Sequence, residues 1–201
     1  IYHIDLTTEK IAPLDSHIEK AVWSPDGKYI FYKYTDAATS KGALTIAAPD
    51  GSGYKVAREF NFSGVDIDWL KVGTTLAFGL TPSGYRQNSI YSMTTDGKNF
   101  TKVLGDAFGL AALWSPNGKQ MIFTTGVERA SSLQLSLANG NGNNAQPIDL
   151  VKTLINKCIW SSDNKTIYCA VPKQVTQSFV LPDDYAQGRV TTEDTFWKIN
   201  A

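Results

Sequence analysis

The stretch WSPDGKYIFY, residues 23–32, decides the fold of this chain. It reads as the end of one strand, a tight polar turn and a second strand. The proline presets the backbone of the turn, the glycine can take a positive φ, and the residues that follow are aromatic or β-branched. The pattern returns without gaps as WLKVGTTLAF from Trp69, WSPNGKQMIF from Trp114 and WSSDNKTIYC from Trp160. These tryptophans lie 46, 45 and 46 residues apart, which predicts a repeat architecture.

The first repeat is predicted to contain four antiparallel strands. They cover residues 21–23, 29–32, 43–47 and 54–58, with a loop at 33–42 and a second tight turn at 49–53. Four strands within about 45 residues match the size of one β-propeller blade.

The remaining chain fills the same slots. Third strands are predicted at 89–93, 132–137 and 195–199, fourth strands at 100–104 and 145–150, and an incomplete leading pair at 2–6 and 10–14. We therefore expect one all-β domain over residues 1–201: a β-propeller of four-stranded antiparallel blades, with seventeen strands or about four and a quarter blades. The blade repeats lie near 1–14, 21–59, 67–104, 112–150 and 157–201. An open solenoid is the alternative, but it would expose its sheet edges.

This number of blades closes no standard ring, so the chain is predicted to be a segment of a larger one. It also begins at Ile1, inside a strand-like stretch, which suggests part of a longer protein.

The turn motif resembles a known repeat. W-S-P-D-G-K at 23–28, W-S-P-N-G-K at 114–119 and the weaker W-S-S-D-N-K at 160–165 are similar to the TolB-like (WD40-like) β-propeller repeat. The copy at Trp69 departs from it, with Leu-Lys-Val-Gly at 70–73. The resemblance implies blades rather than an activity. It also implies protein–protein contacts made by one face of the disc, on a secreted, periplasmic or membrane-anchored bacterial protein.

The loops between second and third strands are the predicted functional face. Residues 33–42, 79–88, 124–131 and 171–194 vary in length and content, whereas the other turns are short and alike. Variable loops on a rigid scaffold commonly carry binding, although weak constraint alone would also let them vary. Tyrosine and arginine are frequent in binding hot spots. The candidate contacts are Tyr34, Asp36, Tyr85, Arg86, Gln87, Glu128 and Arg129.

The last of these loops is the strongest candidate, because about 24 residues without a periodic pattern are far beyond ordinary loop length. Its apolar and charged residues suit a peptide or sugar contact. They also suit a flap or interface segment over the blade edge, which is the interpretation we favour. The residues concerned are Phe179, Asp183, Asp184, Tyr185 and Arg189.

Asp66 and Asp68 are candidate channel residues. Asp68 occupies a slot that holds Val22, Leu113 and Ile159 in the other repeats. A carboxylate in an apolar slot needs a partner. Asp68 either accepts hydrogen bonds within the fold, which we favour, or joins Asp66 in binding a cation or polar ligand.

Cys158 and Cys169 flank the last Trp hairpin. A turn that pairs Trp160 with residue 167 also pairs the two cysteines, within reach of a disulfide. Two buried thiols are the alternative. A disulfide would imply an oxidising, extracytoplasmic compartment.

Several classes of chemistry lack a signal in the sequence. The 19 basic and 19 acidic side chains cancel, so no nucleic-acid or anionic-membrane footprint is expected, and membrane contact is expected only through an anchor outside this chain. His3 and His17 lie 14 residues apart without ligand-spaced neighbours, which predicts no metal site. No nucleophile elbow, phosphate loop or H-E-x-x-H motif is present, and no cofactor is expected.

The leading hypothesis is a non-enzymatic binding module whose partner is another protein or a peptide. The alternative is a substrate-gating propeller of a prolyl-oligopeptidase-like serine peptidase, with the catalytic domain elsewhere. A polysaccharide-active propeller using Asp66 and Asp68 is a third and weaker hypothesis.

Overall fold

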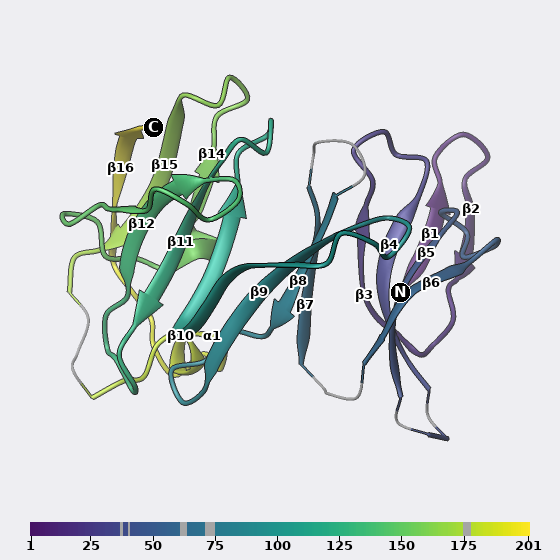
Figure 1. The fold of residues 1–201 in the computed structure, drawn as a ribbon, viewed down its shortest axis with the longest axis horizontal. Helices are drawn as coiled ribbons and strands as arrows, with labels where there is room; N and C mark the ends of the chain where they lie inside the picture. Colours follow the sequence, from purple (N-terminus) through teal and green to yellow (C-terminus); the bar gives the residue numbers. More distant parts are fainter. Residues whose placement is uncertain (37, 40, 61–63, 71–74, 175–177) are drawn as a thin grey trace. The chain divides into compact units, whose positions relative to one another are not determined.

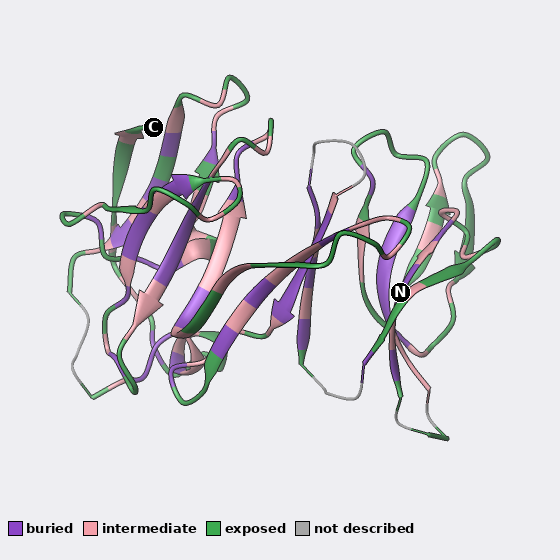
Figure 2. Cartoon of the chain, viewed as in Figure 1, coloured by how far each residue is buried: buried purple, intermediate pink, exposed green. Residues whose placement is uncertain are grey.

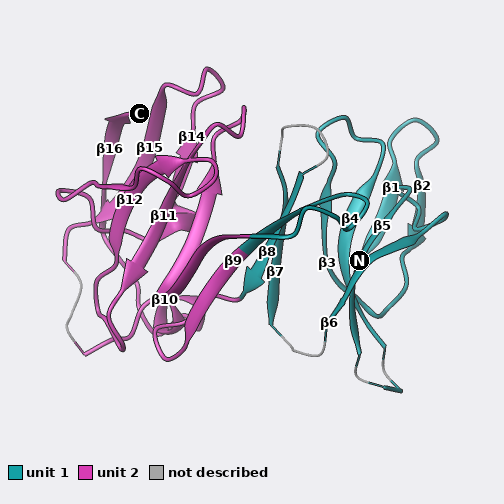
Figure 3. Ribbon diagram, viewed as in Figure 1, with its two compact units in different colours: residues 1–80, 91–101 teal, residues 81–90, 102–201 magenta. Residues whose placement is uncertain are grey.

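The computed structural model describes residues 1–36, 38–39, 41–60, 64–70, 75–174 and 178–201. Within these residues the chain forms sixteen strands, one 3-10 helix and one short α-helix, so it is all-β as predicted (Figure 1). It divides into two compact units, residues 1–80 with 91–101 and residues 81–90 with 102–201 (Figure 3). No helix in the described part is long and apolar enough to span a bilayer.

The first unit confirms the strands predicted around Trp23, each lengthened by one to three residues. A four-stranded antiparallel sheet has the order β3-β4-β5-β6. A leading hairpin, β1 with β2, and a second pair, β7 with β8, belong to the same unit. The bounds are β1 Tyr2–Asp5, β2 Lys10–Pro13, β3 Ile18–Trp23, β4 Ile30–Thr35, β5 Gly42–Ala47, β6 Lys55–Phe60, β7 Val65–Trp69 and β8 Thr75–Leu80.

Two strands run from one unit into the other: β9, Gln87–Thr94, and β10, Thr101–Trp114. The second unit then holds two antiparallel sheets. One continues from β10 through β11 to β13, and the other has the order β14-β15-β16. The bounds are β11 Gln120–Gly126, β12 Gln134–Asn139, β13 Gln146–Pro147, the 3-10 helix Ile155–Lys157, β14 Cys158–Trp160, β15 Thr166–Pro172, α1 Asp183–Ala186 and β16 Asp194–Asn200.

Hydrogen bonds explain why the turn motif specifies a hairpin. The Ser24 hydroxyl accepts the Tyr29 N–H at 2.9 Å and donates to Asp26 at 2.7 Å, and Asp26 accepts the Lys28 N–H at 3.1 Å. The same three bonds recur around Ser115 and around Ser161. A serine and the Asp or Asn two residues after it thus close the turn through their side chains. The departing turn after Trp69 falls mostly on residues 71–74, which lie outside the described part.

Two strand predictions were wrong. The fourth strand predicted at 145–150 contains only Gln146 and Pro147, because proline has no N–H to donate to a ladder and the Val151 N–H closes a turn on Ile148. The strand predicted at 100–104 does not end before the next one begins. Instead, β10 continues to Trp114, with positive φ at Asp106 and Gly109 and a register shift between Phe108 and Ala111.

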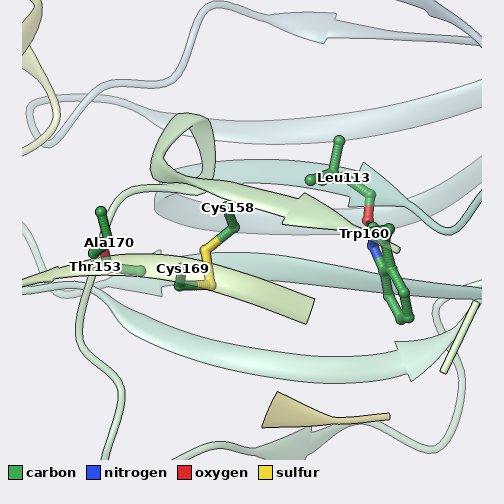
Figure 4. The surroundings of a disulfide bond; sticks show 6 residues. All are labelled: Leu113, Thr153, Cys158, Trp160, Cys169 and Ala170. Carbon is green, nitrogen blue, oxygen red and sulfur yellow. Dashed lines mark hydrogen bonds between the residues drawn. A yellow bond between two sulfur atoms is a disulfide. The ribbon is translucent and has the colours of Figure 1, made fainter. Parts of the chain in front are cut away.

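Each unit has its own apolar core (Figure 2). In the first, Phe31, Leu44 and Leu76 are fully buried around Trp69. In the second, Ile122, Leu135 and Ile167 are fully buried with Trp160, whose indole N–H donates to the Leu113 carbonyl at 3.1 Å (Figure 4). Trp160 therefore joins its sheet to the backbone of the neighbouring sheet.

Candidate functional site

Three of the predicted loops meet in the second unit. We call residues 81–86, 127–133 and 178–193 the loop cluster. The Arg129 N–H donates to the Gly84 carbonyl at 2.7 Å, and the Leu181 N–H donates to the Ala130 carbonyl at 2.9 Å. These hydrogen bonds join loops from three different repeats. The loop cluster is therefore one continuous surface rather than three separate loops.

Asp183 fastens this surface. One carboxylate oxygen accepts the Ser83 hydroxyl at 2.8 Å, and the other accepts the Gly84 N–H at 2.7 Å, across about 100 residues of sequence. A Cβ on Gly84 would lie 2.6 Å from the Leu181 carbonyl oxygen, so the close approach of the two segments requires glycine here. Both oxygens of Asp183 are thus committed to bonds within the chain.

Asp184 is also used inside the loop. Its side chain is buried and accepts the Val180 N–H at 2.7 Å, while the Arg189 N–H donates to its carbonyl at 2.8 Å. The Arg189 guanidinium lies 2.8 Å from the other carboxylate oxygen without an aligned N–H, so the two form an ion pair rather than a directed hydrogen bond. The described part of the loop is therefore a packed segment around helix α1, and residues 175–177 lie outside the described part.

The exposed residues that were predicted as contacts lie at the first two segments of the loop cluster and, with Arg189, in the third. Tyr85 is about half exposed, and the Arg129 guanidinium lies 5.3 Å from its ring centroid. Arg86, Gln87 and Glu128 are exposed. Arg129 is held at a φ of 56°, in the left-handed region that arginine rarely occupies. The structure thus brings Tyr85 and Arg129 together at the surface, as a cation–aromatic pair.

Phe179 and Tyr185 are half-buried. Tyr185 packs against a small core of Ala130, Leu133, Leu154 and Leu181. The Lys157 ammonium lies 4.8 Å from the Tyr185 ring centroid and 2.7 Å from an Asp194 carboxylate oxygen, and it also bonds the Thr192 hydroxyl. Ser83, Gly84 and Lys157 were not among the predicted site residues, because no local pattern connects them to partners 28 to 100 residues away.

Tyr34 and Asp36 lie in the first unit. The Tyr34 ring centroid is 5.6 Å from that of His17. Asp36 accepts the N–H groups of Ala38 and Thr39, and the Thr39 N–H, the largest cause, lowers the pKa of the Asp36 carboxyl. Asp36 therefore acts as a turn-forming side chain. Residues 37 and 40 of this loop lie outside the described part.

The channel candidates are partly buried. Asp66 forms an ion pair with Lys20 of the preceding repeat. Asp68 is partly buried, as are Val22 and Leu113 at the equivalent positions, which pack against the two cores. Ile159, at the fourth equivalent position, is 66% exposed. Within the described residues, no three His, Cys, Asp or Glu side chains gather as a metal-binding group.

The disulfide between Cys158 and Cys169 is present, as predicted (Figure 4). The two cysteines are directly opposed in the β14–β15 ladder, as are Trp160 and Ile167, and their Cα atoms lie 4.1 Å apart. Cys169 is buried in the core of the second unit, so the bond fastens the hairpin that carries Trp160.

The fold places the chain among β-propellers. No protein-family model matches the sequence, and no curated protein matches it. Among solved structures, TolB from Acinetobacter baumannii is similar with a TM-score of 0.60 at 19% identity, over 83% of this chain and 41% of that one. An oligogalacturonate lyase in complex with manganese has a TM-score of 0.60 at 14% identity, over 84% and 52%.

The β-propeller domain of the Trilobed protease from Pyrococcus furiosus has a TM-score of 0.60 at 10% identity, over 100% of this chain and 63% of that one. This chain therefore spans between 41% and 63% of the length of these three proteins. Identities this low show the fold alone. The chain is a β-propeller module with a TolB-like fold.

Proposed function

We propose that this chain is a non-enzymatic binding module, and that the loop cluster is the surface through which it contacts a protein or peptide. One observation carries the proposal: three loops from different repeats are joined by hydrogen bonds while Tyr85, Arg86, Glu128 and Arg129 stay exposed. A pre-ordered surface loses little conformational freedom when a partner binds. Tyrosine and arginine are also the side chains that most often carry binding energy.

Selection of a phage-displayed peptide library against the chain tests this proposal. We expect enriched peptides whose affinity falls at least about tenfold in Tyr85→Ser and in Arg129→Ser, because hot-spot truncations cost ~2 kcal/mol or more. Tyr54→Ser is the matched control, since Tyr54 is 70% exposed in the first unit, outside the loop cluster. Peptides that bind all three variants equally would contradict the proposal.

Point variants are better suited to this test than deletion of residues 173–189. Val180 and Leu181 are buried, and Asp183 holds Ser83 and Gly84. A deletion would therefore disturb the packing of the whole loop cluster, and a loss of binding would not identify the contact surface.

A second candidate is a substrate-gating propeller of a prolyl-oligopeptidase-like serine peptidase. Similarity to the propeller domain of the Trilobed protease favours it. The catalytic residues would then belong to an α/β-hydrolase domain elsewhere in the protein. Sequencing the gene beyond the codon for Ala201 tests this candidate, because a G-x-S-x-G elbow downstream would support it.

We further propose an oxidising, extracytoplasmic location, supported by the disulfide between Cys158 and Cys169. Peptide mapping of the protein from its native source under non-reducing conditions tests this location. Two free thiols would contradict it.

A further inference from the structure

A cavity of about 260 Å³ opens inside the second unit, and neither Tyr85 nor Arg129 lines it. Its apolar lining comes from three connections: Leu133, Leu154, Leu181 and Val190. All four side chains are buried, and Leu133, Leu181 and Val190 belong to the loop cluster. These four side chains form the floor of the cavity. The volume lies just below the range of about 300–1,000 Å³ typical of drug-sized ligands, which suits one compact apolar group.

The polar lining is rich in donors. Lys152, Ser131 and Ser132 line the cavity, and none of them forms a side-chain hydrogen bond or ion pair with another described residue. The hydroxyl of Thr153, by contrast, is committed to the Ala170 carbonyl at 2.6 Å. An ammonium group and two hydroxyls are therefore available at the cavity.

The charges around the cavity leave Lys152 uncompensated. No carboxylate lines the cavity. Each acidic side chain of the neighbouring loop has at least one partner: Glu193 pairs with Lys173, Asp194 with Lys157, Asp184 with Arg189, and Asp183 with Ser83 and Gly84. Tyr185 also lines the cavity, and the Lys157 ammonium lies 4.8 Å from its ring centroid. The cavity thus combines an apolar floor with a positive, donor-rich rim.

We propose that this cavity captures the C-terminal residue of a peptide, with an apolar side chain on the floor and the free carboxylate at Lys152. Charge complementarity selects a carboxylate, and the small volume selects a single apolar residue. The inference rests on the proposed function, because a peptide terminus is the ligand of a peptide-binding module. It adds a partner chemistry and a second anchor point to that function.

Fluorescence anisotropy with a labelled hexapeptide that ends in Ala-Leu with a free carboxylate tests the proposal. We expect the same peptide with an amidated C-terminus to bind at least about tenfold more weakly, because the carboxylate is lost. Lys152→Met should weaken binding of the acid form about fivefold and leave the amide unchanged. Lys165→Met is the matched control, since Lys165 is exposed on the β14–β15 turn and does not line the cavity.

The inference would be overturned by equal binding of acid and amide, by unchanged binding in Lys152→Met, or by no binding at millimolar concentration. Competition by 4-methylpentanoate as strong as by the unlabelled peptide would also overturn it, because the site would then take free apolar acids. The peptide-library test on Tyr85 and Arg129 is read separately, so a failure here leaves the broader proposal standing.

Discussion

The two sheets of the second unit carry equivalent side chains in opposite environments. In the sheet of β10–β13, Leu113, Ile122 and Leu135 face the next sheet, and Ile122 and Leu135 are 0% exposed. In the sheet of β14–β16, the register places Ile159, Tyr168 and Phe196 in the same slots, and they are 66%, 47% and 89% exposed. The strand pattern is shared, but the burial is not.

This difference shows that a neighbouring sheet, rather than the strand sequence, buries a blade face in this fold. Trp160 makes the point directly. It lies on the inner face of the second sheet and bonds the backbone of the first, whereas Tyr168 on the outer face has no such cover. Alternation along a strand predicts two faces, but it cannot say which of them is covered.

The largest expected effect is a loss of stability from truncation of the covered face. Ile122→Ala and Leu135→Ala should each lower the free energy of unfolding by about 2–5 kcal/mol, because they remove apolar contacts and leave a cavity. Phe196→Ala should change it by less than about 0.5 kcal/mol, because its side chain is exposed. Urea unfolding of the three variants measures the difference. Equal losses of stability in all three variants would contradict the difference between the covered and the exposed face.

The next effect concerns the disulfide, which occurs only in the second sheet. The equivalent slots of the first sheet hold Ala112 and Phe123. The double variant Cys158→Ala with Cys169→Ala should lose about 2–3 kcal/mol, as expected for the short loop that the bond closes. Thermal unfolding with and without reductant measures the loss. A wild-type protein that is insensitive to reductant would contradict the expectation.

A smaller effect distinguishes the Trp turns of the two sheets. The second sheet has Asp163 where the first has Asn117. The Ser161 hydroxyl, the largest cause, and the Lys165 N–H lower the pKa of the Asp163 carboxyl. The pKa of Asp163 is therefore lower in the folded protein than in the unfolded chain, so the ionised carboxylate stabilises the fold at neutral pH. This stabilisation is lost as the pH falls through the folded pKa, which lies below the ordinary value of 3.8.

NMR titration of the Asp163 carboxyl measures this shift. We expect Ser161→Ala to raise the pKa toward its ordinary value, whereas Ser115→Ala, the same change in the first sheet, should leave it unmoved. A pKa that does not respond to Ser161→Ala would show that the hydroxyl bond is not its cause.

Most of the fold could be predicted from the sequence because the turns are local. Serine, Asp or Asn, and a following positive φ lie within a few residues of one another, so Trp23, Trp114 and Trp160 locate their hairpins. The failures have non-local or backbone causes. Pro147 shortens its strand to two residues, and Asp106 and Gly109 bend β10 without ending it.

The candidate site was predictable only in part. The order of the strands grouped the loops, three of which lie together in the second unit, and the cysteine pair followed from the turn register. The role of Asp183 could not be inferred, because its partners Ser83 and Gly84 lie about 100 residues away and neither segment carries a motif. Only tertiary packing shows that the two acidic residues of α1 have different partners.

The most direct test of the loop cluster is amide hydrogen exchange at Gly84 and Arg129, in the wild type and in Asp183→Ala. We predict that both amides are protected in the wild type, because Gly84 donates to Asp183 and Arg129 donates to Gly84. Asp183→Ala should speed exchange at Gly84 at least about tenfold and leave Ile122 protected. Wild-type Gly84 and Arg129 amides that exchange at the rate of free loops would contradict the account, because the three loops would then not form one surface.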